Sequence, residues 1–184
     1  MTDVERLRAA RRIMIVGAPG SGKSTLATRL GPELGLPVHR VDNLIWAPNW
    51  TERDVDTRVA EALAIEAGEA WIFEGGGAQT FDNRVTRADL MIWLDAPVGR
   101  RIWRLIRRAI RWRGRARPEM AEGCVERLDK NWLAFLAWVW VTRVQRDAEC
   151  ADLMAKAGDK GLRLTSLKAV NRLVAALPDP SGER

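Results

Sequence analysis

The stretch "RIMIVGAPGSGKST", residues 12–25, decides the fold that we expect for this chain. Its apolar first part, 12–16, has the length and composition of a short buried strand. Its second part, 17–25, contains the pattern Gly-x-x-x-x-Gly-Lys-Ser. Glycines let backbone N–H groups approach an anion closely, and a helix that follows turns the positive end of its dipole toward the same place. The stretch therefore predicts a strand, a phosphate-binding loop and a helix over 22–34.

The loop residues also predict what is bound. Lys23 offers a positive charge to the β- and γ-phosphates of a nucleoside triphosphate, and the Ser24 hydroxyl is a ligand for Mg²⁺. We therefore expect ATP and Mg²⁺ as cofactors, with Lys23 as a catalytic residue and Ser24 as the metal-binding residue. The pattern does not distinguish a kinase from a GTPase, a motor or a switch. The expected nucleotide-binding residues are Gly17, Ala18, Pro19, Gly20, Ser21, Gly22, Lys23, Ser24 and Thr25.

Outward from this loop, short apolar runs alternate with longer amphipathic runs, which is typical of βαβ units and a parallel sheet. We predict an α/β, three-layer P-loop NTPase fold with a five-stranded parallel sheet and an arginine-rich helical lid. Further strands are expected over 38–42, within 70–77, within 89–97 and over 161–166. Further helices are expected over 51–68 (N-cap Thr51), 98–112 and 131–157, and after Ser166 as far as Pro178.

Composition points to one globular domain, 1–184, because 47% of the 184 residues are hydrophobic and 29% are charged. No uncharged apolar run is long enough for a transmembrane helix, and the start of the chain lacks the pattern of a signal peptide. Cys124 and Cys150 are too few and too far apart for a disulfide framework or a zinc site, and His39, the single histidine, is expected to be structural. We expect a cytoplasmic protein without a membrane partner.

Positive charge is concentrated in one segment of this chain, whose net charge is +6. No acid interrupts the arginines Arg100, Arg101, Arg104, Arg107, Arg108, Arg111, Arg113, Arg115 and Arg117. The segment is either a solvated face that binds nucleic acid through backbone charge, or a lid, with an insertion at about 111–127, that closes over ATP. We favour the lid, because forked guanidinium groups suit bidentate phosphate contacts, and we take Arg115 and Arg117 as catalytic.

Three acids follow predicted strands, where the carboxyl ends of parallel strands face a ligand crevice. Asp42 is the first candidate to contact the phosphoryl acceptor, as general base or through Mg²⁺; the alternative is a turn or cap acid. Glu74, before Gly75, is a candidate for Mg²⁺ or the acceptor; the alternative is a hydrogen bond at a strand end. Asp95 ranks lower, because a helix start after "DAP" would also use an aspartate.

In this order of elements the chain resembles adenylate kinase and other small nucleoside-monophosphate kinases. It resembles more closely the bacterial group called "DNA topology modulation protein". The stretches that carry this resemblance are "VDNLIWAPNW" (41–50), "WIFEGGG" (71–77), "RADLMIWLDAP" (87–97) and "RGRARPEMAEGCVERL" (113–128).

The resemblance implies further site residues. The arginines seven and eleven places after Pro97, which are Arg104 and Arg108, are implied to hold ATP. Glu74 stands where such kinases have aspartate. Arg84 is the implied acceptor-side arginine, with Arg87 as its alternative, and Arg143 and Arg146 are implied to belong to the set that follows the lid.

Two departures from the kinase pattern concern the acceptor. "EGGGAQT" (74–80) replaces the usual Asp-Gly-Phe-Pro stretch, and the tryptophan-rich segment before Thr51 shows no recognisable pocket for adenosine monophosphate. Trp46 and Trp50 either stack on an acceptor ring or pack under the next helix. The expected acceptor-binding residues are Asp42, Trp46, Glu74, Gly75 and Arg84.

The sequence thus predicts an ATP-binding phosphotransferase that moves the γ-phosphoryl group to a nucleotide or another small acceptor. An ATP-dependent nucleic-acid-binding protein that modulates DNA topology, and an ATPase without an acceptor, are the alternatives.

Overall fold

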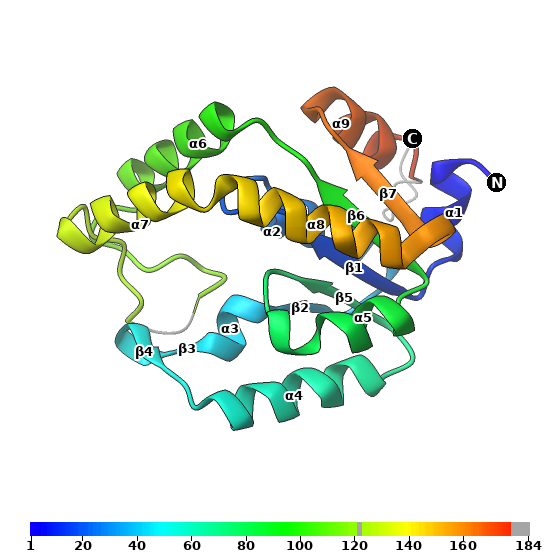
Figure 1. Ribbon diagram of the computed structural model, residues 1–184, viewed down its shortest axis with the longest axis horizontal. Coiled ribbons are helices and arrows are strands. Elements are labelled where there is room, and N and C mark those ends of the chain that lie inside the picture. Colours follow the sequence, from blue (N-terminus) through cyan, green and yellow to red (C-terminus); the bar gives the residue numbers. More distant parts are fainter. Residues whose placement is uncertain (121–122, 178–184) are drawn as a thin grey trace.

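The computed structural model describes residues 1–120 and 123–177, which form a parallel sheet between two layers of helices (Figure 1). The predicted three-layer fold with a five-stranded parallel sheet is confirmed. The strand order is β2-β5-β1-β6-β7. These strands are β1 (Arg12–Val16), β2 (Val38–Arg40), β5 (Trp71–Glu74), β6 (Leu90–Leu94) and β7 (Gly161–Leu164).

Alternation of side chains along β1 creates two separate cores. Ile13 and Ile15 face α1 (Asp3–Ala9), α2 (Lys23–Leu34) and α9 (Leu167–Ala175). Met14 and Val16 point to the opposite face, where the second core forms. The helices on that side are α3 (Val41–Ile45), α4 (Val55–Ala67), α5 (Phe81–Arg87) and α8 (Arg143–Ala157). Because β1 pairs with β5 and with β6, the phosphate loop after it leaves the middle of the sheet.

Two boundaries differ from the prediction near the second strand. β2 ends at Arg40, and Asp42 lies in the first turn of α3, so it does not end a strand. Helix α4 begins after Asp54, whose carboxylate accepts a hydrogen bond from the Thr57 N–H; Thr51 is not its cap. Thr51 instead belongs to β4 (Thr51–Glu52), which pairs with β3 (Trp46–Ala47) in a small hairpin.

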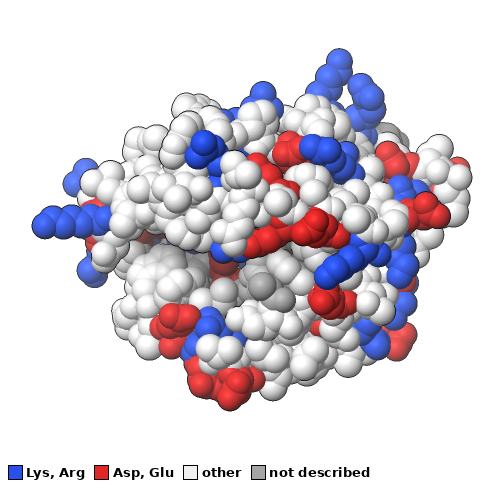
Figure 2. Space-filling model, in the orientation of Figure 1, with Lys and Arg blue, Asp and Glu red and all other residues white. Residues whose placement is uncertain are grey.

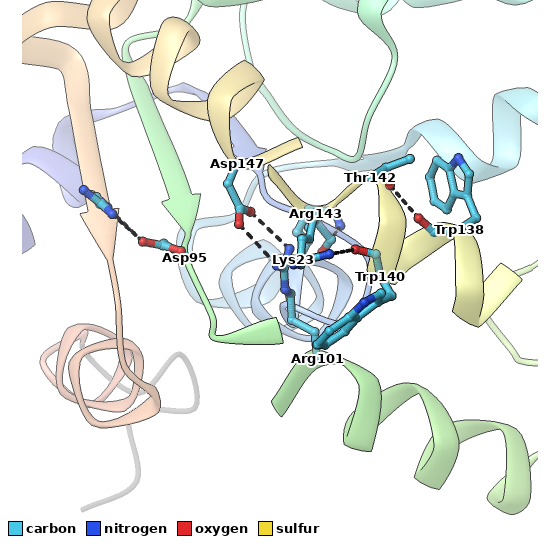
Figure 3. A network of polar contacts seen from close by, with 10 residues as sticks. Lys23, Asp95, Arg101, Trp138, Trp140, Thr142, Arg143 and Asp147 are labelled. Carbon is cyan, nitrogen blue, oxygen red and sulfur yellow. Dashed lines mark hydrogen bonds and ion pairs between the residues drawn. The ribbon is translucent and has the colours of Figure 1, made fainter. Parts of the chain in front are cut away.

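The helix predicted over 131–157 is two helices, α7 (Lys130–Val141) and α8, separated at Thr142. The Thr142 hydroxyl donates a hydrogen bond of 2.8 Å to the Trp138 carbonyl, and an Arg143 guanidinium N–H donates one of 2.6 Å to the Trp140 carbonyl (Figure 3). The Trp138 carbonyl also accepts the Thr142 backbone N–H at 2.9 Å, so the hydroxyl bond is added to the helical one, and side-chain bonds of this kind accompany local bends of helices.

Other expectations agree with the structure. Helix α6 (Val98–Arg111) carries much of the arginine segment, and Ser166 caps α9 through the Ala169 N–H. The segment after α6 has no helix among its described residues and is joined by isolated bridges, Arg113 to Glu126 and Ala116 to Val125. Within 1–120 and 123–177, no helix is long and apolar enough to cross a membrane.

Besides α3, two further helices, α1 and α5, had no expected counterpart. In α1, Thr2 and Glu5 form a capping box with reciprocal side-chain-to-backbone hydrogen bonds. Helix α5 follows the glycines after β5. Both helices are seven residues long, too short for an amphipathic period to stand out in the sequence.

Candidate active site

A cleft of about 2090 Å³ lies at the carboxyl ends of the strands. Its walls come from the phosphate loop, α3, the turn after β5, α6, the segment after α6 and the α7–α8 junction. Figure 2 shows this face of the molecule hollowed between α7 above and the β3–β4 hairpin below. The predicted site residues that line it are Gly17 to Thr25, Asp42, Trp46, Glu74, Gly75, Arg104, Arg108 and Arg117. The structure thus brings together most of the residues that the sequence singled out.

The phosphate loop has a backbone that only glycine permits at key places. Gly17, Gly20 and Gly22 have φ angles of 147°, 78° and 106°. A Cβ at Gly20 would lie 2.5 Å from the Arg101 carbonyl oxygen, so a side chain there would push α6 away. Lys23, first residue of α2, directs its ammonium group into the loop and donates to the Ala18 carbonyl at 3.3 Å.

Two arginines fix helix α6, one against the phosphate loop and one against α8. The Arg104 guanidinium donates to the Ser21 carbonyl at 2.8 Å, and burial lowers its pKa. Arg101 is buried and forms a two-pronged contact with Asp147 of α8, at 3.1 and 3.3 Å (Figure 3). Arg104 is therefore beside the expected phosphates, whereas Arg101 holds α6 and α8 together.

Acid and base groups meet beside Lys23. Glu74 is buried, and its pKa is raised because desolvation outweighs the opposing effects of Lys23 and of a hydrogen bond from Ser24. The Arg40 Nε lies 3.8 Å from the Glu74 carboxylate. Asp42 is near enough to raise the Glu74 pKa further. Two carboxylates therefore lie within electrostatic range of the predicted metal-binding hydroxyl.

Asp42 and Asp95 differ in availability. Asp42 is exposed in the cleft, and it forms no ion pair or side-chain hydrogen bond within the described part of the chain. Asp95 also lines the cleft, but Arg163 of β7 holds its carboxylate at 2.6 Å. Asp42 is thus the acid that is free to meet a ligand.

The two arginines predicted as catalytic have different surroundings. Arg117 is buried, and its Nε lies 2.8 Å from the carboxylate of Glu126. The Nε of Arg108 lies 3.8 Å from the same oxygen, and burial and the charge of Arg117 lower the Arg108 pKa. Arg115 is exposed and lies outside the cleft lining, although its carbonyl accepts a hydrogen bond from the Glu126 N–H. The structure therefore does not place the Arg115 side chain in the site.

The structure does not place Arg84, the expected acceptor-binding arginine, in the cleft. Its side chain is 1% exposed and lies outside the cleft lining. The Nε donates at 2.8 Å to Glu66, a guanidinium N–H donates at 2.9 Å to Thr80, and the group stacks 3.8 Å from the centre of the Phe73 ring. Burial lowers its pKa. Arg84 supports the turn after β5 from beneath, because all its donors point into protein.

Other arginines named from the resemblance also bind protein. Arg87 donates to the backbone carbonyls of Glu66 and Ala67. Arg146 lines the cleft but is paired at 2.8 Å with Glu149, and Arg143 lies outside the lining.

The segment after α6 is attached to the β3–β4 hairpin. The Trp50 indole N–H donates at 3.0 Å to the Val125 carbonyl, and Cys124 donates from its thiol to the Ala47 carbonyl at 3.5 Å. Trp46 lines the cleft and packs edge-to-face on Trp50, with ring centroids 5.6 Å apart. His39 packs on Phe73 in the core, as expected of a structural residue.

The residues present fit a bound Mg²⁺-nucleotide. The loop is an open cradle at Gly22, where only the Arg104 guanidinium comes within 4 Å of an added Cβ. The buried Ser21 hydroxyl, which faces into the loop near Gly17, has no hydrogen-bond partner within the described residues. Hydroxyl and carboxylate oxygens from Ser24 and Glu74 are the donor types that Mg²⁺ prefers.

Glu126 is the main site residue that was missed. It is the carboxylate that Arg108 and Arg117 share, and it reaches them because 113–126 folds back on itself. No signal in the sequence singled it out, because Glu126 is one of three glutamates, with Glu119 and Glu122, in the insertion at about 111–127.

Solved structures share the fold of this chain. Shikimate kinase from Acinetobacter baumannii, solved in complex with shikimate, superposes with a TM-score of 0.53 at 18% identity, over 92% of each chain. Shikimate kinase from Bacteroides thetaiotaomicron gives a TM-score of 0.53 at 15% identity, over 91% of this chain and 96% of that one. No protein-family model and no curated protein matches the sequence. At these identities the likeness establishes a P-loop kinase fold.

Proposed function

We propose that this protein is a P-loop phosphotransferase that moves the γ-phosphoryl group of ATP to a hydroxyl group of a small molecule. The observation that carries this is the meeting of three parts in one cleft. These parts are the phosphate loop, the Asp42 and Glu74 carboxylates, and the arginines Arg108, which is partly exposed, and Arg117, which is buried. The shared fold with shikimate kinases supports the same reaction class.

The donor side is built for a triphosphate. The loop amides and the dipole of α2 would bind the phosphates, with Lys23 on the β- and γ-oxygens. Ser24, and Glu74 directly or through water, would hold Mg²⁺, which neutralises charge on the phosphates when it is bound. Arg104, already beside Ser21, would add a further cation.

On the acceptor side, Asp42 would orient the hydroxyl group and take its proton. The hydroxyl oxygen forms a bond to the γ-phosphorus, the bond from that phosphorus to the β,γ-bridging oxygen breaks, and ADP leaves with the bonding electrons. Arg108 of α6, and Arg117 in the segment that we propose as a lid at about 111–127, would stabilise the charge on the transferring group.

The arrangement of the arginine segment favours this function over nucleic-acid binding. Arg101, Arg104, Arg108 and Arg117 make protein contacts or line the cleft, as a segment that closes over a nucleotide would, although the other five arginines of the segment are exposed. Membership of the DNA topology modulation group stays a prediction from sequence.

Lys23→Ala tests the proposal, with Lys156→Ala as the control. Lys156 is exposed and pairs with Asp82, away from the cleft. ATP consumption would be screened over nucleosides, nucleotides, sugars and small acids. We expect Lys23→Ala to lower turnover about 100-fold or more and the control to match the parent chain. Unchanged turnover in Lys23→Ala contradicts the phosphate-loop mechanism. ATP loss that no acceptor stimulates indicates an ATPase, and tight, salt-sensitive duplex binding would favour the nucleic-acid alternative.

A further inference from the structure

The half of the cleft that would hold the acceptor lies across from the phosphate loop. Asp42, Trp46, Glu74 and Gly75, four of the residues expected to bind the acceptor, line the cleft. The α7–α8 junction also lines it. An acceptor hydroxyl must enter here to reach the γ-phosphate position beside Lys23 in line.

Aromatic rings supply much of this half. Trp46 presents its ring with Trp50 edge-on behind it. Phe135 and Trp138 of α7 stack with their centroids 5.9 Å apart and their planes at 24°. Phe81, from the start of α5, also lines the cleft. Flat apolar walls of this kind favour a ligand with a ring or another flat apolar surface.

The arginines nearest the acids of this half already have carboxylate partners, whereas Arg100, Arg107 and Arg111 of α6, which also line the cleft, are exposed to solvent. Arg117 and Arg108 share Glu126, at 2.8 and 3.8 Å, and Arg146 is paired with Glu149 at 2.8 Å. Arg108 and Arg117 are also the cations that the donor phosphates would attract. Arg127 lies at the mouth of the cleft and is exposed to solvent, where a charge contributes little.

Arg84, which lies under the turn after β5, is also paired with a carboxylate already. The resemblance to nucleoside-monophosphate kinases implied that it binds the acceptor phosphate, but it is enclosed under the turn after β5 and paired with Glu66. A phosphate or carboxylate in the acceptor half would meet no unpaired arginine from that turn.

Negative charge, by contrast, is available there. Asp42 is exposed and forms no ion pair within residues 1–120 and 123–177. Glu74 lies beneath it, close enough for the two charges to interact. An anionic group placed beside these carboxylates would be repelled in a partly buried site, where screening by salt is weak.

We infer that the acceptor is a hydroxyl compound with a ring, neutral or carrying an amine, and without a phosphate or carboxylate group. This inference rests on the proposed function, because it concerns the acceptor half of the same site. It predicts that neither a nucleoside monophosphate nor a carboxylic acid is the preferred acceptor.

Paired ligands that differ by one anionic group test the inference. The pairs are adenosine and AMP, cytidine and CMP, methyl shikimate and shikimate, and tyrosol and 4-hydroxyphenylacetate. Binding is measured by calorimetry on the full chain saturated with Mg²⁺ and a non-hydrolysable ATP analogue, so that no ligand can enter the donor half. Transfer from ATP to each compound is measured in parallel.

We expect the neutral member to bind at least about tenfold more tightly in one pair or more, with no pair reversed. Tighter binding of any anionic member, or no binding by any neutral member, overturns the inference while leaving the kinase proposal intact if transfer to another acceptor occurs. Failure of the ATP analogue to bind overturns the proposed function, and the inference with it.

The variant Glu126→Gln gives an independent measurement. Its amide cannot hold the charges of Arg108 and Arg117, so these arginines become available to anions. We expect AMP and shikimate to gain affinity about tenfold or more in this variant, while adenosine and methyl shikimate do not. Equal changes for both members of a pair contradict the claim that paired arginines exclude anions.

Discussion

Replacing Arg84 by methionine provides the sharpest test of how the acceptor side is supported. Arg84 is 1% exposed and its partner Glu66 is 0% exposed. The substitution removes donors to Glu66 and Thr80 and leaves the Glu66 carboxylate with only the Thr80 hydroxyl and the Asn83 amide, each at 2.6 Å. An uncompensated buried charge costs roughly 3–5 kcal/mol. A loss of about 4 kcal/mol in a chain of this size lowers Tm by about 8–16 °C.

Urea unfolding of a double-mutant cycle measures this cost. The cycle comprises Arg84→Met, Glu66→Leu and the double variant, and Lys156→Met is the control because its pair with Asp82 is exposed. We expect Lys156→Met to cost less than about 1 kcal/mol. The double variant should cost less than the sum of the single ones by about 2 kcal/mol or more, since it leaves no unpaired charge. A loss below about 1 kcal/mol for Arg84→Met, or strict additivity, would refute the assignment of Arg84 as a buried support.

Three further predictions concern the cleft and its lid. Burial raises the pKa of Glu74 in the folded chain, so the contribution of Glu74 to stability falls as pH rises through that pKa. Glu74→Gln should therefore raise the free energy of unfolding more at pH 8 than at pH 4. Urea titrations at both pH values measure this, and an equal gain at both contradicts it. Burial raises the pKa of Cys150 to about 11 from 9.0, which leaves roughly a hundredfold less thiolate near neutral pH. Peptide mapping after iodoacetamide treatment at pH 8 should therefore find this cysteine protected in the folded chain and labelled in urea. Rapid labelling of the folded chain counts against the described burial. Trp50→Phe removes the N–H that binds the Val125 carbonyl at 3.0 Å. Hydrogen exchange of the backbone amides of residues 123–126 should become about five times faster, which corresponds to the loss of about 1 kcal/mol from one hydrogen bond. Unchanged exchange means that the hairpin does not hold this segment.

The parts of the fold that the sequence predicted are those determined by local chemistry. The phosphate loop requires positive φ angles and the start of a helix within a few residues. Gly20, Gly22 and Lys23 therefore predict the loop without information from the rest of the chain. Helix α6 was also predictable, because Pro97 precedes it and its buried side follows a helical period. The strands of the sheet are apolar runs with polar ends, and all five were located correctly, although β2 ends before Val41 and Asp42 and β7 ends before Thr165 and Ser166.

The structure differs from the sequence predictions where a contact with another segment of the chain determines the position of a residue. Arg84 has the spacing of an acceptor-binding residue, but Glu66, 18 residues earlier, draws it into the interior. Thr51 would cap a helix well, yet it pairs with Ala47 across a hairpin. In each case the local pattern allows two outcomes, and tertiary contacts select one.

The half of the cleft for the donor depends on a local motif, whereas the half for the acceptor depends on contacts between distant segments. This difference explains why the acceptor is harder to identify than the donor. ATP phosphates are bound mainly by backbone N–H groups, which few sequences can present, so a short motif identifies the donor. The acceptor half is made of side chains from α3, the turn after β5, α7 and the segment after α6, and it is held by contacts such as that of Trp50 with Val125. Its chemistry depends on which charges are already paired, as with Arg117 and Glu126. Only the folded chain shows those pairings, so the same arginines that suggest an anionic acceptor in the sequence argue against one in the structure.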